Sequence, residues 1–599
     1  MTKIKRLNRL RMILAIDSTV DEIFSSLLPL EEKRLLLRQH LTDTLLTLVD
    51  GKEKIPALEW VVCRDTVGVL RNILSERSEE LAGFSFLKYL NDLLHSPSPF
   101  DLPPLTADFL AEFEHLIKGM NGKSGIYKEK PPAFLKYSGT KASKLRSTDL
   151  SRMARNSNKL INRYPSGLDD ELRSQQSKNK EAIKNFFGIT DLEWNDWKWH
   201  IKHITRDAKT MSQMVALSPD EFEAITKARQ NHIPFGVTPY YLSLMDQDNS
   251  KSWDRTLRAQ VIPPPEYVEG IIRGRETDDR SMDFMIENDT SPIEGVTRRY
   301  PNIVILKPIL TCPQICVYCQ RNWEIKDVYS ENATLGGEKL AQALQWIKDT
   351  PEINEVLITG GDPLLLSDEK IEKILVKLSQ IDNIIRIRIG TRTPVTLPQR
   401  ITDSLVRTIA RFHEPGRREI VLVTHFEHTT EITPDAMGAV QKFRLFGMGV
   451  YNQLVFTYYN SRRFEVAALR QKLRLIGVSP YYTFNTKGKA ETDQYRVPIA
   501  RLLQERQEEA RLLPGMVRTD EIVFNVPLLG KNYLLAAQNR DIISILPDGC
   551  RVYEFHPWEK KIALVNTYIY TDVSIYNYLN RLRKDGEKTK DYSTIWYYY

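Results

Sequence analysis

The chain has 599 residues, several times the length of a typical domain, so more than one folding unit is expected. Its composition, 42% hydrophobic and 27% charged, excludes a disordered chain, and no apolar run of about 20 residues indicates a membrane span. The net charge of +7 is small for this length and does not indicate nucleic-acid binding.

The first 120 residues are expected to be helical, because leucines recur at three- and four-residue spacings from residue 30 onward. Residues 121–185 are rich in Lys, Ser and Asn and contain few apolar clusters. We interpret this stretch as a basic polar linker. A contact with nucleic acid or acidic lipid is the alternative left open.

Short apolar strands and amphipathic helices alternate in the following part of the chain. The expected strands are 302–308, 355–361, 384–390, 419–426, 449–456 and 478–486, and the expected helices are 368–381, 404–412, 434–447 and 463–477. A strand followed by a helix, repeated about six times, predicts an α/β fold with parallel strands, either a barrel or a doubly wound sheet. Chemistry in such folds lies at the C-terminal ends of the strands.

The predicted organisation has five parts. They are a helical N-terminal domain of unknown role (1–120), the basic linker (121–185), a helical lead-in (186–285), the α/β core (286–535) and a C-terminal closing segment with a hairpin at 545–555 (536–599).

Three of the five cysteines lie together. Cys312, Cys316 and Cys319 form the pattern C-x3-C-x2-C directly after an expected strand. Thiolates select zinc or iron–sulfur clusters, and a structural zinc site normally needs a fourth protein ligand. Cys63 and Cys550 are distant in the chain, and no histidine lies near the loop. A [4Fe-4S] cluster with one open iron is therefore favoured, and zinc or a chance group of buried cysteines are the alternatives.

This spacing, with aromatic Tyr318 before the third cysteine, resembles the radical S-adenosylmethionine (SAM) superfamily. The resemblance implies that SAM binds the open iron and yields a 5′-deoxyadenosyl radical. It also implies a partial (β/α)6 barrel, a reducing cytoplasmic setting and an electron donor such as flavodoxin or ferredoxin. The SAM-binding positions that it implies are Tyr318, Gly360, Gly361, Asp362, His425 and Gln453.

Longer segments are similar to the lysine 2,3-aminomutase family, namely 237–246, 289–302, 357–368, 388–402 and 477–484. That family also binds pyridoxal 5′-phosphate (PLP) as a Schiff base to a lysine. The matching segment, 522–531, makes Lys531 the catalytic and PLP-binding candidate, although Pro-Leu-Leu-Gly replaces the glycine run of the family.

Arginines match further positions of the family. Arg299 matches one of two basic residues that bind the PLP phosphate. The second position is Ile303, so neighbouring Arg298 could take over this role. Arg321 matches the arginine that binds the substrate α-carboxylate, and a planar guanidinium suits such a contact.

Two positions bear on the substrate. The lysine enzymes use two aspartates to hold the distal ammonium group, and the matching positions here are Lys487 and Asn525. Lysine with asparagine is also the pattern of the glutamate 2,3-aminomutase branch. The alignment around Lys487 leaves nearby Lys489 as an alternative. A lysine in place of an acid disfavours a cationic substrate. The resemblance therefore implies a substrate with a carboxylate side chain, most simply L-glutamate.

The resemblance thus implies an isomerase that moves the α-amino group to Cβ through a PLP aldimine, giving β-glutamate. Its cofactors would be a [4Fe-4S] cluster, SAM and PLP, and its partners a small amino acid and an electron donor, without membrane or nucleic acid. The lysine enzymes bind zinc between subunits through clustered C-terminal cysteines. Such a zinc site is not expected here, because Cys550 is the one cysteine in this part of the chain, and homo-oligomer formation is left open. A lysine or arginine aminomutase and a non-catalytic iron–sulfur interaction protein are the alternatives.

Overall fold

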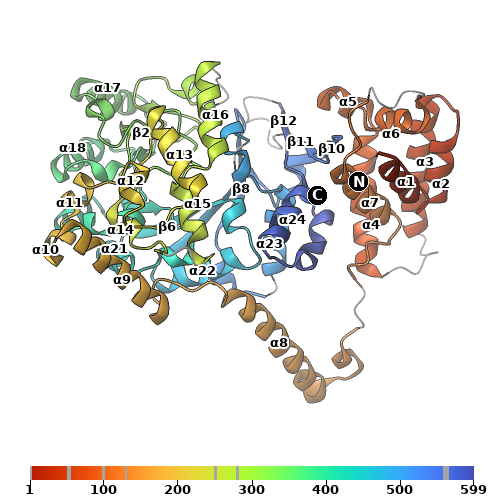
Figure 1. The fold of residues 1–599 in the computed structure, drawn as a ribbon, viewed down its shortest axis with the longest axis horizontal. Helices are drawn as coiled ribbons and strands as arrows, with labels where there is room; N and C mark the ends of the chain where they lie inside the picture. The colour runs from red at the N-terminus through yellow and green to blue at the C-terminus, as the bar shows by residue number, and fades with distance from the viewer. Residues whose placement is uncertain are drawn as a thin grey trace. The chain divides into compact units, whose positions relative to one another are not determined.

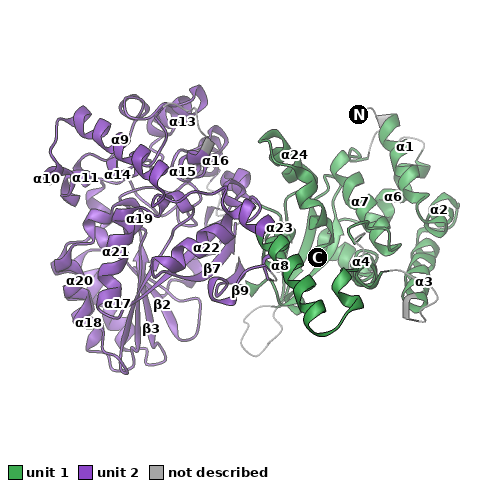
Figure 2. Ribbon diagram, turned by 90° about the horizontal axis from the view of Figure 1, so that it is seen from below, with its two compact units in different colours: residues 1–154, 497–508, 532–599 green, residues 155–496, 509–531 purple. Residues whose placement is uncertain are grey.

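A computed structural model describes residues 3–49, 56–96, 102–127, 131–247, 252–277, 282–486, 488–510, 512–556 and 566–599 (Figure 1). The chain forms two compact units (Figure 2). The smaller contains residues 1–154, 497–508 and 532–599, and the larger contains residues 155–496 and 509–531.

The core of the larger unit is a nine-stranded sheet in which the spatial order of the strands follows the chain. Strands β2 to β8 pair in parallel, and β1 pairs antiparallel with β2. The strands are β1 (Val296–Thr297), β2 (Ile303–Ile309), β3 (Glu355–Gly360), β4 (Arg386–Gly390), β5 (Glu419–Thr424), β6 (Gly449–Phe456), β7 (Ser479–Asn485), β8 (Glu521–Val526) and β9 (Gly530–Tyr533). All six expected strands are present, and β8 was not anticipated.

Helices connect the parallel strands. They are α17 (Gly337–Lys348), α18 (Asp368–Ser379), α20 (Asp403–Ala410), α21 (Pro434–Leu445) and α22 (Glu465–Leu475). The side chains of Ser367, Thr402 and Thr433 cap three of them by accepting a backbone N–H in the first turn. Each strand therefore passes into a well-defined helix and returns in parallel, which confirms the predicted α/β fold with a partial (β/α)6 barrel.

Further helices precede the sheet. They are α9 (Asp170–Phe187), α10 (Asp191–Trp194), α11 (Trp197–Lys202), α12 (Ala208–Met211), α13 (Pro219–Gln230), α14 (Pro239–Leu242), α15 (Arg255–Val261) and α16 (Pro265–Glu276). Backbone N–H groups of Ile315 and Val317 donate to the carbonyls of Gly236, before α14, and Gln260, in α15. The lead-in helices thus hold the cysteine loop in place.

Both ends of the chain build the smaller unit. Its helices are α1 (Lys3–Leu14), α2 (Ser18–Ser25), α3 (Leu30–Val49), α4 (Ala57–Ile73), α5 (Glu76–Ala82), α6 (Phe86–His95), α7 (Ala107–Met120), α23 (Ile499–Glu509) and α24 (Ile575–Lys584). An antiparallel sheet of β10 (Arg540–Ile545), β11 (Arg551–Phe555) and β12 (Tyr568–Thr571) joins them. Buried Glu112 in α7 forms an ion pair with Arg551 in β11, with Oε1 and Nε 3.0 Å apart.

The units differ from the organisation expected from the sequence. Residues 121–185 contain two long helices, α8 (Gly139–Ile161) and α9, and the unit boundary falls within α8. The segment 536–599, expected to be a C-terminal closing segment after the core, belongs to the same unit as the N-terminal helices. The hairpin expected at 545–555 is present as the β10–β11 pair.

Candidate active site

A cavity of about 290 Å³ lies at the C-terminal ends of the parallel strands. It gathers residues from distant parts of the sequence. The expected site residues that line it are Arg299, Cys312, Cys316, Tyr318, Cys319, Arg321, Gly360, Gly361, Asp362, His425, Gln453, Asn525 and Lys531. Lys487 lies outside the described residues.

The cysteine loop follows β2 and forms one wall of the cavity. Ile315 belongs to a small apolar cluster with Ile204, Ile325 and Val328, against which two of the cysteines pack. Burial raises the pKa of the Cys312 thiol well above its usual range. Among the described residues, no three His, Cys, Asp or Glu side chains lie close enough together to hold a metal ion.

The Gly360–Gly361 turn at the end of β3 packs against the start of this loop. Gly360 has a φ of +112°, and a Cβ on Gly361 would collide with the Thr311 carbonyl oxygen. The Gly361 and Asp362 N–H groups donate to the carbonyls of Ile309 and Thr311 at 2.7 and 2.9 Å. Only glycines allow this close approach, which brings the β3 turn to the cysteines.

Buried Asp362 serves as a structural acceptor as well as lining the cavity. The Thr391 hydroxyl donates to it at 2.7 Å, and the Arg392 and Leu364 N–H groups donate at 2.9 and 3.1 Å. Burial raises the pKa of Asp362, which these hydrogen bonds partly oppose. The carboxylate therefore ties the end of β3 to the end of β4.

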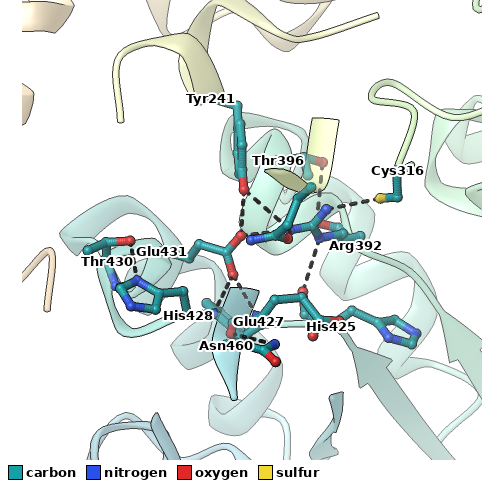
Figure 3. Close-up of polar contacts among 12 residues, drawn as sticks. Tyr241, Cys316, Arg392, Thr396, His425, Glu427, His428, Thr430, Glu431 and Asn460 are labelled. Atoms are coloured by element: carbon teal, nitrogen blue, oxygen red, sulfur yellow. Dashed lines mark hydrogen bonds and ion pairs between the residues drawn. The ribbon is translucent and has the colours of Figure 1, made fainter. Parts of the chain in front are cut away.

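Arg392 is a cavity residue that the sequence reasoning missed. Its Nη1 donates to the Cys316 Sγ at 2.9 Å, and its Nη2 lies 2.6 Å from Glu431 Oε1 (Figure 3). Its Nε donates to the carbonyl of His425 at 3.2 Å, while burial lowers the pKa of the His425 ring to about 4. The motif Gly-Thr-Arg at the end of β4 is the signal that could have identified it.

Glu427 lies beside this group but does not line the cavity (Figure 3). Burial raises its pKa to about 8, and the charge of Arg392 opposes that shift. One of its oxygens accepts from the Val455 N–H at 2.9 Å. Near neutral pH this carboxyl group is therefore mostly protonated.

The opposite end of the cavity contains Lys531 in β9. Its Nζ lies 4.4 Å from the centroid of the Tyr300 ring and 5.0 Å from that of Tyr482. Burial, with smaller effects from the charges of Arg388 and Arg299, lowers the pKa of Lys531 to about 8. A larger fraction of this amine is uncharged near neutral pH than of an ordinary lysine.

Arg299 and Arg321 converge on buried Glu287. Glu287 lies 3.0 Å from Arg321 Nε and 3.3 Å from Arg299 Nη2. Burial alone would raise its pKa, but these arginine charges lower it to about 2. Arg299 Nε is buried without a hydrogen-bond partner. The acid aligns both guanidinium groups at the cavity wall.

Arg388 in β4 is a second cavity residue that sequence reasoning missed. It forms an ion pair with Glu355, and its Nη1 donates to the Tyr481 hydroxyl at 3.0 Å. Arg298, the alternative to the missing arginine at position 303, donates to the Pro301 carbonyl and does not line the cavity. The alternation of arginine with isoleucine in Arg386–Gly390 could have indicated that Arg388 faces the barrel interior.

Asn525 reaches the cavity from β8, and its Oδ1 has no hydrogen-bond partner. Lys489, the alternative to Lys487, does not line the cavity. It is buried, pairs with Glu491 at 2.8 Å and donates to Asn322. Lys489 thus has a local ion pair of its own.

Comparison with known proteins identifies the family. The radical SAM superfamily model matches residues 306–444. A KamA family protein of Methanocaldococcus jannaschii, described as uncharacterized, is 45% identical over 559 residues, covering 90% of this chain and 89% of the relative. The chain belongs to the KamA family.

Named aminomutases are among the relatives of this KamA chain. L-Lysine 2,3-aminomutase of Fusobacterium nucleatum is 32% identical over 53% of this chain and 71% of the relative. Glutamate 2,3-aminomutase of Clostridioides difficile is 30% identical over 67% of this chain and 89% of the relative. The protein is a radical SAM aminomutase, and the predicted family is confirmed.

The donor set fits the cofactors of a radical SAM enzyme. Three thiols line one cavity from one loop, which suits a [4Fe-4S] cluster with an open iron. The glycine turn, whose matching positions bind SAM in the superfamily, lines the same cavity. None of the helices in the described part of the chain has the length and apolar character of a membrane span.

Proposed function

We propose that this KamA protein is a 2,3-aminomutase for an amino acid with a carboxylate side chain, most simply L-glutamate, which it converts to β-glutamate. The supporting observation is the charge of the cavity. Its cationic side chains are Arg299, Arg321, Arg388, Arg392 and Lys531. Among the described lining residues, Asp362 is the one carboxylate, and it accepts hydrogen bonds from the protein.

This charge pattern disfavours a lysine substrate. A buried ammonium group needs carboxylate partners, because an uncompensated charge in a low-dielectric site is costly. Asn525 supplies a neutral amide at the position where the lysine enzymes are expected to have an aspartate. By the family resemblance, Lys487 would face the distal carboxylate of a substrate with two carboxylates, while Arg321 would bind its α-carboxylate.

PLP is part of the proposal, with Lys531 as its attachment point. The aromatic rings of Tyr300 and Tyr482 flank the amine, and its lowered pKa favours nucleophilic attack on an aldehyde. Arg299 and Arg388 lie close enough to affect that pKa and would supply positive charge to the phosphate. Bound PLP would supply a conjugated π-system that stabilises an unpaired electron beside the migrating nitrogen.

The remaining residues bind and orient the substrate. Cys312, Cys316 and Cys319 would hold the cluster that, with SAM and an external electron donor such as flavodoxin or ferredoxin, supplies the radical. Arg321 would bind the α-carboxylate through its Nη atoms, while its Nε stays on Glu287. Holding the carboxylate fixes which Cβ hydrogen faces the radical source.

Apolar side chains exclude water from this chemistry. Those that line the cavity are Ile303, Ile305, Leu357, Val423, Val455 and Phe484. An apolar lining would strengthen the charged contacts in the cavity and protect a reactive radical from solvent.

Anaerobic turnover tests the proposal. The reconstituted protein, with SAM, PLP and dithionite, is given ¹³C-labelled L-glutamate or L-lysine, and the products are identified by NMR. We expect labelled β-glutamate and no β-lysine. Turnover of lysine without glutamate would contradict the anionic-substrate assignment but retain the aminomutase chemistry. Release of 5′-deoxyadenosine without either product would contradict both.

A further inference from the structure

The contact between Arg392 and Cys316 connects the cysteine loop to a buried ionic group. Arg392 Nη1 donates to Cys316 Sγ at 2.9 Å, and the arginine side chain is only 10% exposed. The cysteine sulfur stands here for a thiolate of the iron–sulfur cluster. A guanidinium remains charged at all working pH values, so this donor is permanent.

Arg392 is held in place independently of the cysteine. Its Nη2 pairs with Glu431, which is fully buried, at 2.6 Å and donates to Gln260. Its guanidinium also lies 5.6 Å from the centroid of the Tyr241 ring. Arg392 therefore does not depend on a bound cofactor for its orientation.

Glu431 is itself fixed by four donors. Its Oε2 accepts the N–H groups of Glu427 and His428 at 2.7 and 3.2 Å, and its Oε1 accepts the Tyr241 hydroxyl at 2.7 Å. The fourth donor is Arg392. As Figure 3 shows, the carboxylate and the sulfur lie on different sides of the guanidinium. The pair is thus a rigid dipole with its positive end toward Cys316.

Such a dipole affects the electron affinity of a cluster. Reduction adds one negative charge to the cluster and its thiolates, and a charged N–H donor at a sulfur stabilises the reduced form more than the oxidised form. The effect is large where water is excluded. No bond is made or broken in this step, and the electron comes from the external donor.

We propose that Arg392 is a positioning residue that raises the reduction potential of the [4Fe-4S] cluster through its hydrogen bond to Cys316. Glu431 and Tyr241 hold it in the required orientation. The proposal depends on the cluster and not on the identity of the amino-acid substrate, so the two can fail separately.

The test is an EPR-monitored redox titration of the reconstituted holoprotein without SAM or substrate. Arg392→Gln should lower the ratio of reduced to oxidised cluster about tenfold at a fixed potential, a shift of about 59 mV for one electron. Arg392→Lys, which keeps the charge, should recover part of the shift. Arg411→Gln removes an exposed arginine that is paired with Glu372 at 2.6 Å and should leave the potential unchanged.

An unchanged potential in Arg392→Gln with normal iron and sulfide content would overturn the proposal, even if SAM binding weakens. If that variant cannot hold a cluster, a measurement on the wild-type protein still tests the proposal. Electron–nuclear double resonance on reduced protein labelled with guanidino-¹⁵N arginine should show ¹⁵N coupling to the cluster, which Arg392→Lys abolishes. No coupling in the wild type would refute the contact.

Discussion

The two ends of the cavity are built differently. At the cluster end, three cysteines come from one loop, and the glycine turn that packs on them comes from the next strand of the sheet. At the lysine end, Arg299, Arg388 and Lys531 come from β-strand ends and loops far apart in the chain. The first end depends on local spacing, and the second depends on the whole barrel.

In the proposed reaction, the first end would generate the radical and the second would select the substrate. The cluster end has the pattern of the whole superfamily. The lysine end departs from the aminomutase pattern at Ile303, at the Pro-Leu-Leu-Gly turn before Lys531 and at Asn525. Variants at the two ends should therefore affect different steps.

The largest effect is expected at the cluster end. Cys316→Ala removes one of the three proposed cluster ligands, and both SAM cleavage and amino-acid turnover should fall to the detection limit. Release of 5′-deoxyadenosine and loss of the iron–sulfur absorbance measure this. Cys550→Ala is the matched control, and equal loss in both variants would contradict the assignment of the cysteine loop.

Lys531→Ala should abolish amino-acid turnover but preserve SAM cleavage, because it removes only the proposed PLP attachment point. The absorbance of protein-bound PLP should therefore be lost in this variant, while 5′-deoxyadenosine is still released. Lys339→Ala, which changes an exposed lysine, should retain both signals. Full turnover by Lys531→Ala would show that the two ends are not divided in this way.

Arg321→Met should lower kcat/KM for glutamate about 10- to 100-fold, as the loss of a charged hydrogen bond is worth about 1.5–3 kcal/mol. Glu287 keeps Arg299 as a partner, so the fold should persist, which thermal unfolding checks. Arg298→Met, whose side chain does not line the cavity, serves as the control. A change in kcat/KM no larger than that of the control would argue against a carboxylate contact.

A smaller effect is expected from Asn525→Asp, which adds a negative charge to the substrate end. The ratio of glutamate to lysine turnover should fall about tenfold, since a like charge now opposes the distal carboxylate. Competition between the two labelled amino acids measures this ratio directly. An unchanged ratio would place Asn525 away from the distal group.

The smallest expected effect concerns pH. The pKa of Lys531 is lowered to about 8, and only the uncharged amine reacts with PLP. The rate of PLP capture should therefore rise about tenfold between pH 7 and 9 and then level off. Stopped-flow absorbance can follow this, and a rate that still rises above pH 10 would indicate an ordinary lysine.

The same contrast explains what could be predicted from the sequence. The cysteine loop and the succession of strands and helices follow from local spacing and alternation, and Gly360–Gly361 was found by its resemblance to the superfamily motif. Arg388 and Arg392 were missed because an arginine at a strand end is common, and what distinguishes them is their contacts with Glu355, Cys316 and Glu431. These contacts require the curvature of the sheet, which no local pattern encodes.

The segments that make up the smaller unit also could not be predicted from local sequence patterns. Glu112 and Arg551 lie 439 residues apart, and neither stands out among the many charged residues of its segment. Only the folded unit shows that each is the buried partner of the other.

This pairing of chain ends has a consequence for synthesis. Helix α7 emerges from the ribosome well before β11, because 439 residues separate Glu112 from the arginine that compensates its buried carboxylate. Part of the core of the N-terminal helices therefore stays uncovered while the barrel is translated, because the β10–β12 sheet that packs with them follows the barrel in the chain. Synthesis of the β10–β12 sheet, and not emergence of the first helices, allows this unit to form.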